Sequence, residues 1–160
     1  MVFKASNDPN NTRNQTIDNL DFYPAIDVAK FRDATRLQDT VTDGRVVEAL
    51  RTSVMDINRE LASWRTTQEE QGYTTLAEVP ADDYGPDAQN PLSEYSHFYL
   101  VAVYSSAKAL LIEFYNDIDT SEEGLRRFVG FEATKDVYLR EAREAIRNIL
   151  GTNHATVELI

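Results

Sequence analysis

The chain contains no cysteine. This absence excludes disulfide bonds, zinc sites built from thiolates and a cysteine nucleophile. Histidine is scarce as well: only His97 and His154 occur, and they lack the spacing of metal ligands. We interpret His97 as a residue of a helical bundle and His154 as part of the C-terminal tail. The sequence also has no phosphate-binding glycine loop and no G-x-S-x-G elbow, so these catalytic and cofactor-binding motifs are missing.

A long hydrophobic run is missing too. The most apolar stretch, residues 98–112, is interrupted by Lys108 and by Ser105-Ser106. It is also shorter than the roughly 20 residues that span a bilayer. The first residues, MVFKASNDPNNTRNQ, lack the apolar core of a secretory signal. We therefore predict a buried helix over 98–112 and no membrane partner.

Basic residues are few: 16 Lys and Arg stand against 27 Asp and Glu, which gives a net charge of −11. This balance argues against a net attraction to nucleic-acid phosphates. Two stretches without any basic residue, 78–94 and 113–123, hold five acidic residues each and so carry −10 of the −11. Their members are Glu78, Asp82, Asp83, Asp87 and Glu94, and then Glu113, Asp117, Asp119, Glu122 and Glu123.

The apolar pattern predicts an all-α fold, a helical bundle over residues 22–151 with an extended arm at each end. Residues 1–21 are rich in Asn, Asp and Thr with few apolar anchors, so we expect a flexible N-terminal arm. Residues 152–160 form an extended C-terminal tail that alternates apolar and polar side chains, as a short strand does. The bundle would hold one short N-terminal helix and three long ones, near 28–36, 43–71, 92–115 and 121–150.

Local signals support these helices. Asp27 is a suitable N-cap for the short helix. In the first long helix, apolar residues recur in steps of three and four from Val47 to Trp64, and Gly72 is a good C-terminal stop. The predicted core includes Leu50, Val54, Ile57, Leu61, Tyr99, Ala102, Leu110 and Ile146.

A long acidic loop is expected between the first two long helices, over residues 73–91. Its prolines and glycine forbid a continuous helix, and we expect Leu76 and Val79 to attach it to the bundle. Asp82-Asp83 could be an acid–base pair, but nothing nearby in the sequence would separate the two pKa values. We therefore interpret them as solvated loop carboxylates.

Two further patterns in the sequence are a partial EF-hand and a group of three arginines. Residues 117–128 imitate the start of an EF-hand, but Glu122 replaces the required glycine and Phe128 the bidentate glutamate, so we predict no calcium site. Arg140, Arg143 and Arg147 form the only basic grouping. Because acidic residues are interleaved with them, at Asp136–Arg140 and Arg140–Glu144 spacings that favour ion pairs, we expect a solvated helix face here.

Three segments in order carry a resemblance to a known family: FYPAIDVAKFRDATRLQDTVTDGRVVEAL, GYTTLAEVPADD and the ending VELI. Together they resemble the head completion proteins (L-type) of temperate phages with contractile tails, over roughly residues 22–160. The aromatic-Pro-x-Ile-Asp opening and the Val-Pro-Ala-Asp-Asp loop are the most specific parts. One departure is the acidic EFYNDID after the third predicted helix, where the family tends to be more basic.

The resemblance implies a structural virion protein of the neck, assembled in the host cytoplasm, with no catalytic residue and no cofactor. Such connectors form a ring of about twelve copies beneath the portal after DNA packaging, closing the head and offering a surface to the tail. Its partners would be the portal protein, neighbouring copies and a tail or tail-completion protein, while DNA passes through the lumen without specific binding. Portal binding would use the tail residues Ala155, Val157, Leu159 and Ile160. The candidate luminal or inter-subunit acidic residues are Asp82, Asp83, Asp87, Asp117 and Asp119.

Two other functions stay open at this point. The narrow apolar stripe of helix 43–71 would also suit a small helical protein–protein adaptor or regulator, which acts as a monomer or dimer and uses this helix for pairing. An enzyme with a carboxylate-bound divalent metal is the third reading. Native size in the presence and absence of a portal protein separates the first two, and the third requires stabilisation by metal.

Overall fold

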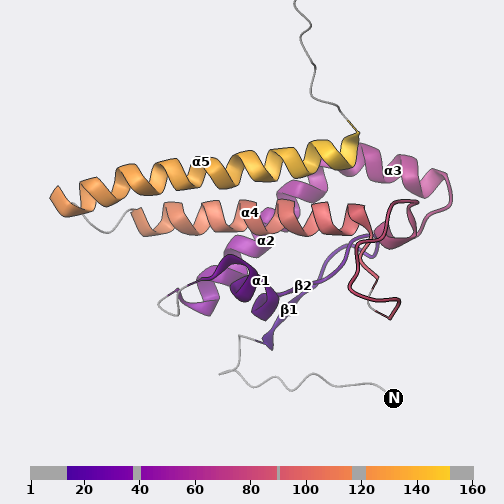
Figure 1. Cartoon of the computed structure of the whole chain (residues 1–160), viewed down its shortest axis with the longest axis horizontal. Coiled ribbons are helices and arrows are strands. Elements are labelled where there is room, and N and C mark those ends of the chain that lie inside the picture. Colours follow the sequence, from indigo (N-terminus) through magenta and orange to yellow (C-terminus); the bar gives the residue numbers. More distant parts are fainter. Residues whose placement is uncertain (1–13, 38–40, 90, 117–121, 152–160) are drawn as a thin grey trace, which may run out of the picture.

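The computed structural model describes residues 14–37, 41–89, 91–116 and 122–151 (Figure 1). The side chains of residues 115–133 lie outside this description. The elements, in chain order, are β1 (Thr16–Ile17), β2 (Ile26–Asp27), α1 (Val28–Thr35), α2 (Asp43–Glu60), α3 (Ala62–Glu70), the 3₁₀ turn η2 (Leu76–Glu78), α4 (Glu94–Asn116) and α5 (Glu122–Leu150). The prediction of a mostly helical chain is confirmed, and the small antiparallel sheet of β1 and β2 was not predicted.

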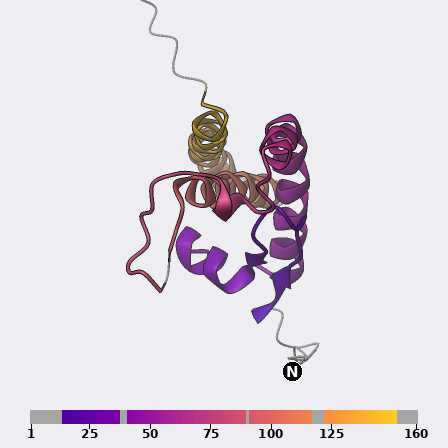
Figure 2. The ribbon, with the colours of Figure 1, turned by 90° about the vertical axis from the view of Figure 1, so that its right-hand side faces the viewer.

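Helix α4 lies at the centre of the molecule. It packs along α5 and also against α2. Figure 1 shows α5 running antiparallel beside α4 over most of its length, and Figures 1 and 2 show α2 crossing α4 on another side, behind it in the view of Figure 1. The run of small buried residues Ala102, Val103 and Ala107 explains why α4 can take this place, because short side chains let neighbouring backbones approach.

The core follows the predicted pattern closely. Seven of the eight predicted core residues are buried, and the eighth, Leu110, is partly buried against them. The apolar stripe of α2 is used within the same chain, since Val47, Leu50, Val54 and Ile57 are all buried. Helix pairing through this stripe, as the adaptor reading requires, would therefore have no apolar surface to use.

The helix predicted over 43–71 is two helices. It is interrupted at Leu61, which has φ −88° and ψ 2° and separates α2 from α3. Leu61 itself is fully buried. The change of direction after it places Trp64 beside Phe22 and Tyr95, with ring centroids 6.3 Å and 5.3 Å away. Aromatic packing against the rest of the domain thus replaces a straight continuation of the helix.

The helix ends agree with the local signals. The Lys30 N–H donates to the Asp27 carboxylate at 3.0 Å, which confirms Asp27 as the N-cap of α1. Gly72 has φ 98°, and the following N–H of Tyr73 donates to the Gln68 carbonyl at 3.2 Å. Gly72 therefore ends α3 in a left-handed conformation that favours glycine.

The folded domain begins before residue 22, the boundary that the sequence predicted. Thr16 and Ile17 pair with Asp27 and Ile26, and the Ile17 side chain is buried. Residues 14–21, which the composition placed in the N-terminal arm, thus contribute to the core. Ile17 anchors β1 to the core, because it is the apolar residue among polar neighbours in this segment.

Candidate interaction site

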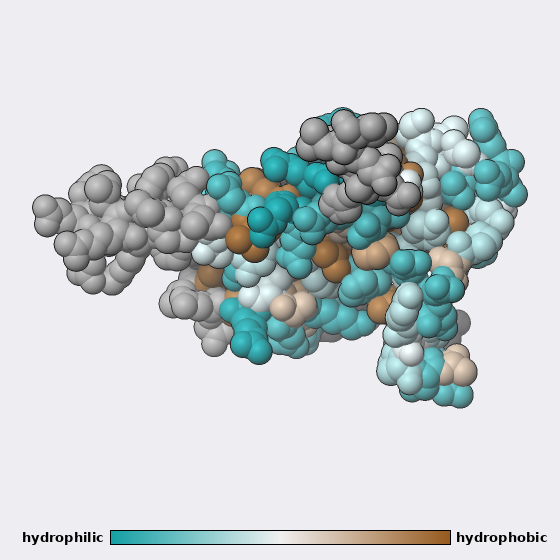
Figure 3. Space-filling view, turned by 45° about the horizontal axis from the view of Figure 1, so that its top comes forward, coloured by the Kyte–Doolittle hydropathy of each residue, from teal (hydrophilic) through white to brown (hydrophobic). Residues whose placement is uncertain are grey.

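The loop between η2 and α4 forms a projecting finger, which we call the acidic finger and which the structure describes over residues 82–89 and 91–93. Its two ends are joined by backbone hydrogen bonds: the Glu94 N–H donates to the Asp82 carbonyl at 2.9 Å, and the Tyr84 N–H to the Leu92 carbonyl at 2.9 Å. Figures 1 and 3 show the finger standing out from the body. The loop before it is attached by buried Leu76 and Val79, as predicted.

The Asp83 carboxylate closes the finger. It accepts hydrogen bonds from the N–H groups of Gly85 and Leu92, each at 2.8 Å. These two donors hold the pKa of Asp83 below its ordinary value, since they stabilise the charged form. A general acid working at neutral pH needs a raised pKa, so this environment is opposite to that of an acid–base pair.

Replacing Asp83 by alanine should open the finger while leaving the helices intact. Amide hydrogen exchange at Gly85 and Leu92 should accelerate by roughly tenfold at neutral pH, because both amides lose their charged acceptor. In the unaltered protein the lowered pKa makes this closure fully present above the ordinary value of 3.8, and it is lost as the pH falls through the lower folded value.

The matched control for this change is Asp82→Ala. The Asp82 carboxylate is exposed and makes no side-chain hydrogen bond or ion pair with the residues that the structure describes. Exchange at Gly85 and Leu92 should therefore stay as it is in the unaltered chain. Equal exchange rates in the Asp82 and Asp83 variants would show that Asp83 does not close the finger.

Two further carboxylates near the finger accept hydrogen bonds from neighbouring residues. The Glu78 carboxylate accepts from the Thr74 N–H and hydroxyl, both at 2.8 Å, and from the Thr75 N–H, and these bonds lower its pKa. The Asp87 carboxylate accepts from the Gln89 N–H at 3.0 Å. The donors to Glu78 are neutral, so they orient its carboxylate without cancelling its charge.

The structure brings together three of the five predicted acidic candidates. Asp82, Asp83 and Asp87 share the finger, whereas Asp117 and Asp119 lie outside the described residues. Glu113, the first acidic residue of the second stretch, lies near the far end of α4 from the finger. At 1.5 Å per residue, α4 separates the two acidic stretches by roughly 30 Å, so the finger and Glu113 belong to different surfaces.

The portal-binding tail, Ala155, Val157, Leu159 and Ile160, also lies outside the described residues. Within the ranges that the structure describes, no three His, Asp or Glu side chains gather closely enough to hold a metal ion. No helix in those ranges is long and apolar enough to cross a membrane.

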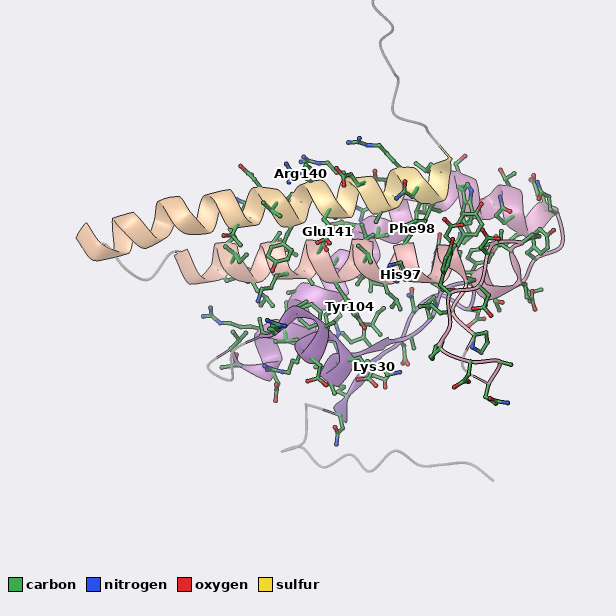
Figure 4. The ribbon with its side chains drawn as sticks, viewed as in Figure 1. Lys30, His97, Phe98, Tyr104, Arg140 and Glu141 are labelled. Carbon is green, nitrogen blue, oxygen red and sulfur yellow. The ribbon has the colours of Figure 1, made fainter. Side chains whose placement is uncertain are left out.

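A second surface lies on the outer side of α5, where Arg140, Arg143 and Arg147 are exposed; we call it the arginine face. The expected ion pairs of Arg140 with Asp136 and Glu144 do not form, and Arg140 and Arg143 make no ion pair with any described residue. The reason is that these side chains are solvated on an open helix face, where an ion pair gains little. Figure 4 shows Arg140 on the outer side of α5.

The inner side of α5 carries contacts that the sequence pattern did not reveal. Glu141 turns toward α4 and accepts a hydrogen bond from the Ser105 hydroxyl at 2.7 Å (Figure 4). Lys135 and Glu113 form an ion pair between the same two helices, with N and O 3.7 Å apart. The polar Ser105 within the apolar run of α4 was the only sign of such contacts in the sequence. Its partner Glu141 could not be identified because it lies on another helix.

The sequence of the chain is similar to a known protein family. Residues 17–160 match the sequence model of a family described as "Phage head completion protein (GPL)". The chain is 33% identical over 144 residues to the "Head completion/stabilization protein" of Escherichia phage P2, an alignment that covers 90% of this chain and 82% of the P2 protein. No solved structure matches the chain significantly.

Proposed function

The chain belongs to the family of phage head completion proteins, and we propose that it acts as the head–tail connector of the virion neck. Head completion is the role of the family as a structural component of the phage particle. The proposed connector assembles beneath the portal after DNA packaging, closes the filled head and presents the surface to which the tail attaches. The family match over nearly the whole described chain carries this proposal.

We propose further that the connector is a ring of about twelve copies around the DNA path. A ring requires two different surfaces on each copy, one for each neighbour. The acidic finger and the arginine face, in which Asp136 and Glu144 are interleaved with the arginines, are two such surfaces on separate elements. The ring also needs a portal-facing part, which we assign to the tail residues 155–160.

The acidic charge of the protein suits this place. Phosphates that pass through a ring are repelled by carboxylates, so a net charge of −11 keeps DNA from binding to the wall. Asp82, Asp83, Asp87, Asp117 and Asp119 are the candidates for positions at the lumen or between copies. DNA is thus a passing molecule in this proposal and not a bound partner.

The proposal is tested with DNA-filled heads that lack this protein. Adding the purified chain should let the heads retain their DNA and join to tails, which nuclease protection and electron microscopy of the products measure. A control uses portal-containing heads that hold no DNA. If the filled heads stay leaky and tailless with the protein added in excess, the connector role is wrong.

Removing residues 155–160 should leave a folded chain with a nearly unchanged melting temperature that no longer joins the heads. The expected reason is that the alternating segment ATVELI adds as a strand to the edge of a partner's sheet, so its loss removes affinity and little internal packing. Thermal unfolding followed by circular dichroism and co-sedimentation with heads measure the two effects.

The control keeps the length of the tail and removes only its apolar character, by Val157→Ser with Leu159→Ser. This variant should fail in the same way as the deletion. A large fall in melting temperature in either variant would instead mean that Val157 and Leu159 fold back onto their own domain.

A further inference from the structure

The arginine face and the acidic finger lie on different sides of the molecule. Figures 1 and 2 show α5 along one edge, with the finger projecting from the body away from it. The two surfaces therefore face different directions within one chain. Each surface is left to meet another molecule.

The two surfaces are complementary in charge and chemistry. Arg140 and Arg143 are exposed and make no ion pair with described residues. The finger and its base carry five acidic residues over 78–94 with no basic residue among them, and the donors to the Asp83 carboxylate are the neutral N–H groups of Gly85 and Leu92. A guanidinium is a planar donor that fits a carboxylate with two parallel hydrogen bonds, so the fit is specific as well as attractive.

We propose that the acidic finger of one copy docks onto the arginine face of α5 in the next copy. This inference rests on the proposed connector function, for which it names the contact between neighbours. Because the two surfaces differ, every copy that accepts a finger also offers one, and the contact propagates from head to tail. Such a contact closes into a ring when the rotation per copy allows it.

Because all copies have the same negative net charge, they need a local attraction between opposite charges in order to associate. Two copies of net charge −11 repel each other at long range. At physiological ionic strength the screening length is about 8 Å, so this repulsion is strongly reduced while ion pairs within about 4 Å are kept. Copies would therefore associate in the orientation that brings the finger to the arginines.

The absence of native cysteine allows a direct test by cross-linking. Ala88→Cys places a thiol on the exposed finger, and Glu144→Cys places one on the outer side of α5 next to Arg140 and Arg143. Under mild oxidation at physiological ionic strength, the double variant should form a ladder of disulfide-linked oligomers on a non-reducing gel. Either single variant should stop at dimers at most, and a mixture of the two single variants should give mixed dimers.

Charge reversal shows whether the arginines and carboxylates cause the contact. In the double-cysteine chain, Arg140→Glu with Arg143→Glu should reduce ladder formation by about tenfold or more, and Asp82→Arg with Asp87→Arg should do the same. Combining both pairs restores complementarity and should restore the ladder. The control, Lys30→Glu with Arg51→Glu, changes the charge by the same amount on exposed residues of α1 and α2 and should have no such effect.

The outcomes separate this inference from the connector function. A missing ladder in the double-cysteine chain, or a ladder that survives the reversal at Arg140 and Arg143, overturns the finger-to-α5 contact. Failure of the combined variant to regain the ladder overturns the role of charge. If such a result comes with normal DNA retention and tail joining by the unaltered protein, the connector function stands and only the docking contact falls.

Discussion

Replacing Arg32 by alanine should lower the free energy of unfolding by about 3 kcal/mol or more, a fall in melting temperature of roughly 6–12 °C for a chain of this size. Arg32 is only 8% exposed. Its Nη2 group donates to the Val41 carbonyl at 2.7 Å and forms an ion pair with the Asp43 carboxylate. Without the guanidinium, the partly buried negative charge of Asp43 loses this counter-charge, and the Val41 carbonyl loses its donor.

The effect is measured by chemical and thermal unfolding followed by circular dichroism. Arg51→Ala is the matched control, since Arg51 is an exposed arginine of α2, and its replacement should change stability by less than about 0.5 kcal/mol. The double variant Arg32→Met with Asp43→Asn should recover part of the loss, because the carboxylate that faced the guanidinium is then neutral. A loss below about 1 kcal/mol for Arg32→Ala would mean that the pair is solvated and does not join α1 to α2.

Much of the helical fold could be predicted because its signals are local. The apolar repeat of α2 and the N-cap at Asp27 depend on residues within one or two turns of each other, and both are confirmed. Gly72 likewise ends α3 through a backbone conformation that its own residue type favours. Such features need no knowledge of the rest of the chain.

The break at Leu61 could not be predicted from the same pattern. Leu61 continues the apolar repeat and contains no helix-breaking group, so the sequence favours one helix through it. The break serves contacts of Trp64 with Phe22 and Tyr95, which lie about 40 and 30 positions away in sequence. Only the assembled domain decides between a straight helix and this packing.

The candidate site was predictable where its signals are local in sequence. Proline and glycine in 80–91 predicted a loop, and the charges predicted its acidity. The closure of the finger depends on which backbone N–H groups the Asp83 carboxylate reaches, one of them nine positions away. That Arg140 is exposed and pairs with neither Asp136 nor Glu144 is likewise a property of side-chain geometry, because the spacing to both residues allowed ion pairs.

Asn58→Ala should destabilise the protein by about 2–3 kcal/mol, which we expect to be the second largest effect. Asn58 belongs to a closed polar network in which the Tyr99 hydroxyl donates to Asn58 Oδ1 at 2.7 Å and Asn58 Nδ2 donates to Asn19 Oδ1 at 2.8 Å. Asn19 Nδ2 in turn donates to the Tyr99 oxygen and to the Pro24 carbonyl, each at 2.8 Å. The network therefore ties the segment before β2 to both α2 and α4.

The expected cost arises at Tyr99, whose side chain is fully buried and stacked on Tyr23 with ring centroids 4.5 Å apart. Burial raises the pKa of the Tyr99 hydroxyl, so the group stays protonated and needs an acceptor for its proton. Removing Asn58 leaves that donor buried without its acceptor, which costs more than a lost surface hydrogen bond.

A double-mutant cycle with Tyr99→Phe tests this reason for the loss. Once the hydroxyl is absent, removing Asn58 should cost about 1 kcal/mol less than it does in the unaltered chain, as measured by urea unfolding. Asn58→Asp is the second comparison, because a carboxylate keeps an acceptor for Tyr99 but cannot donate to Asn19 Oδ1. Strict additivity of Asn58→Ala and Tyr99→Phe would show that the two residues stabilise the domain independently, through packing alone.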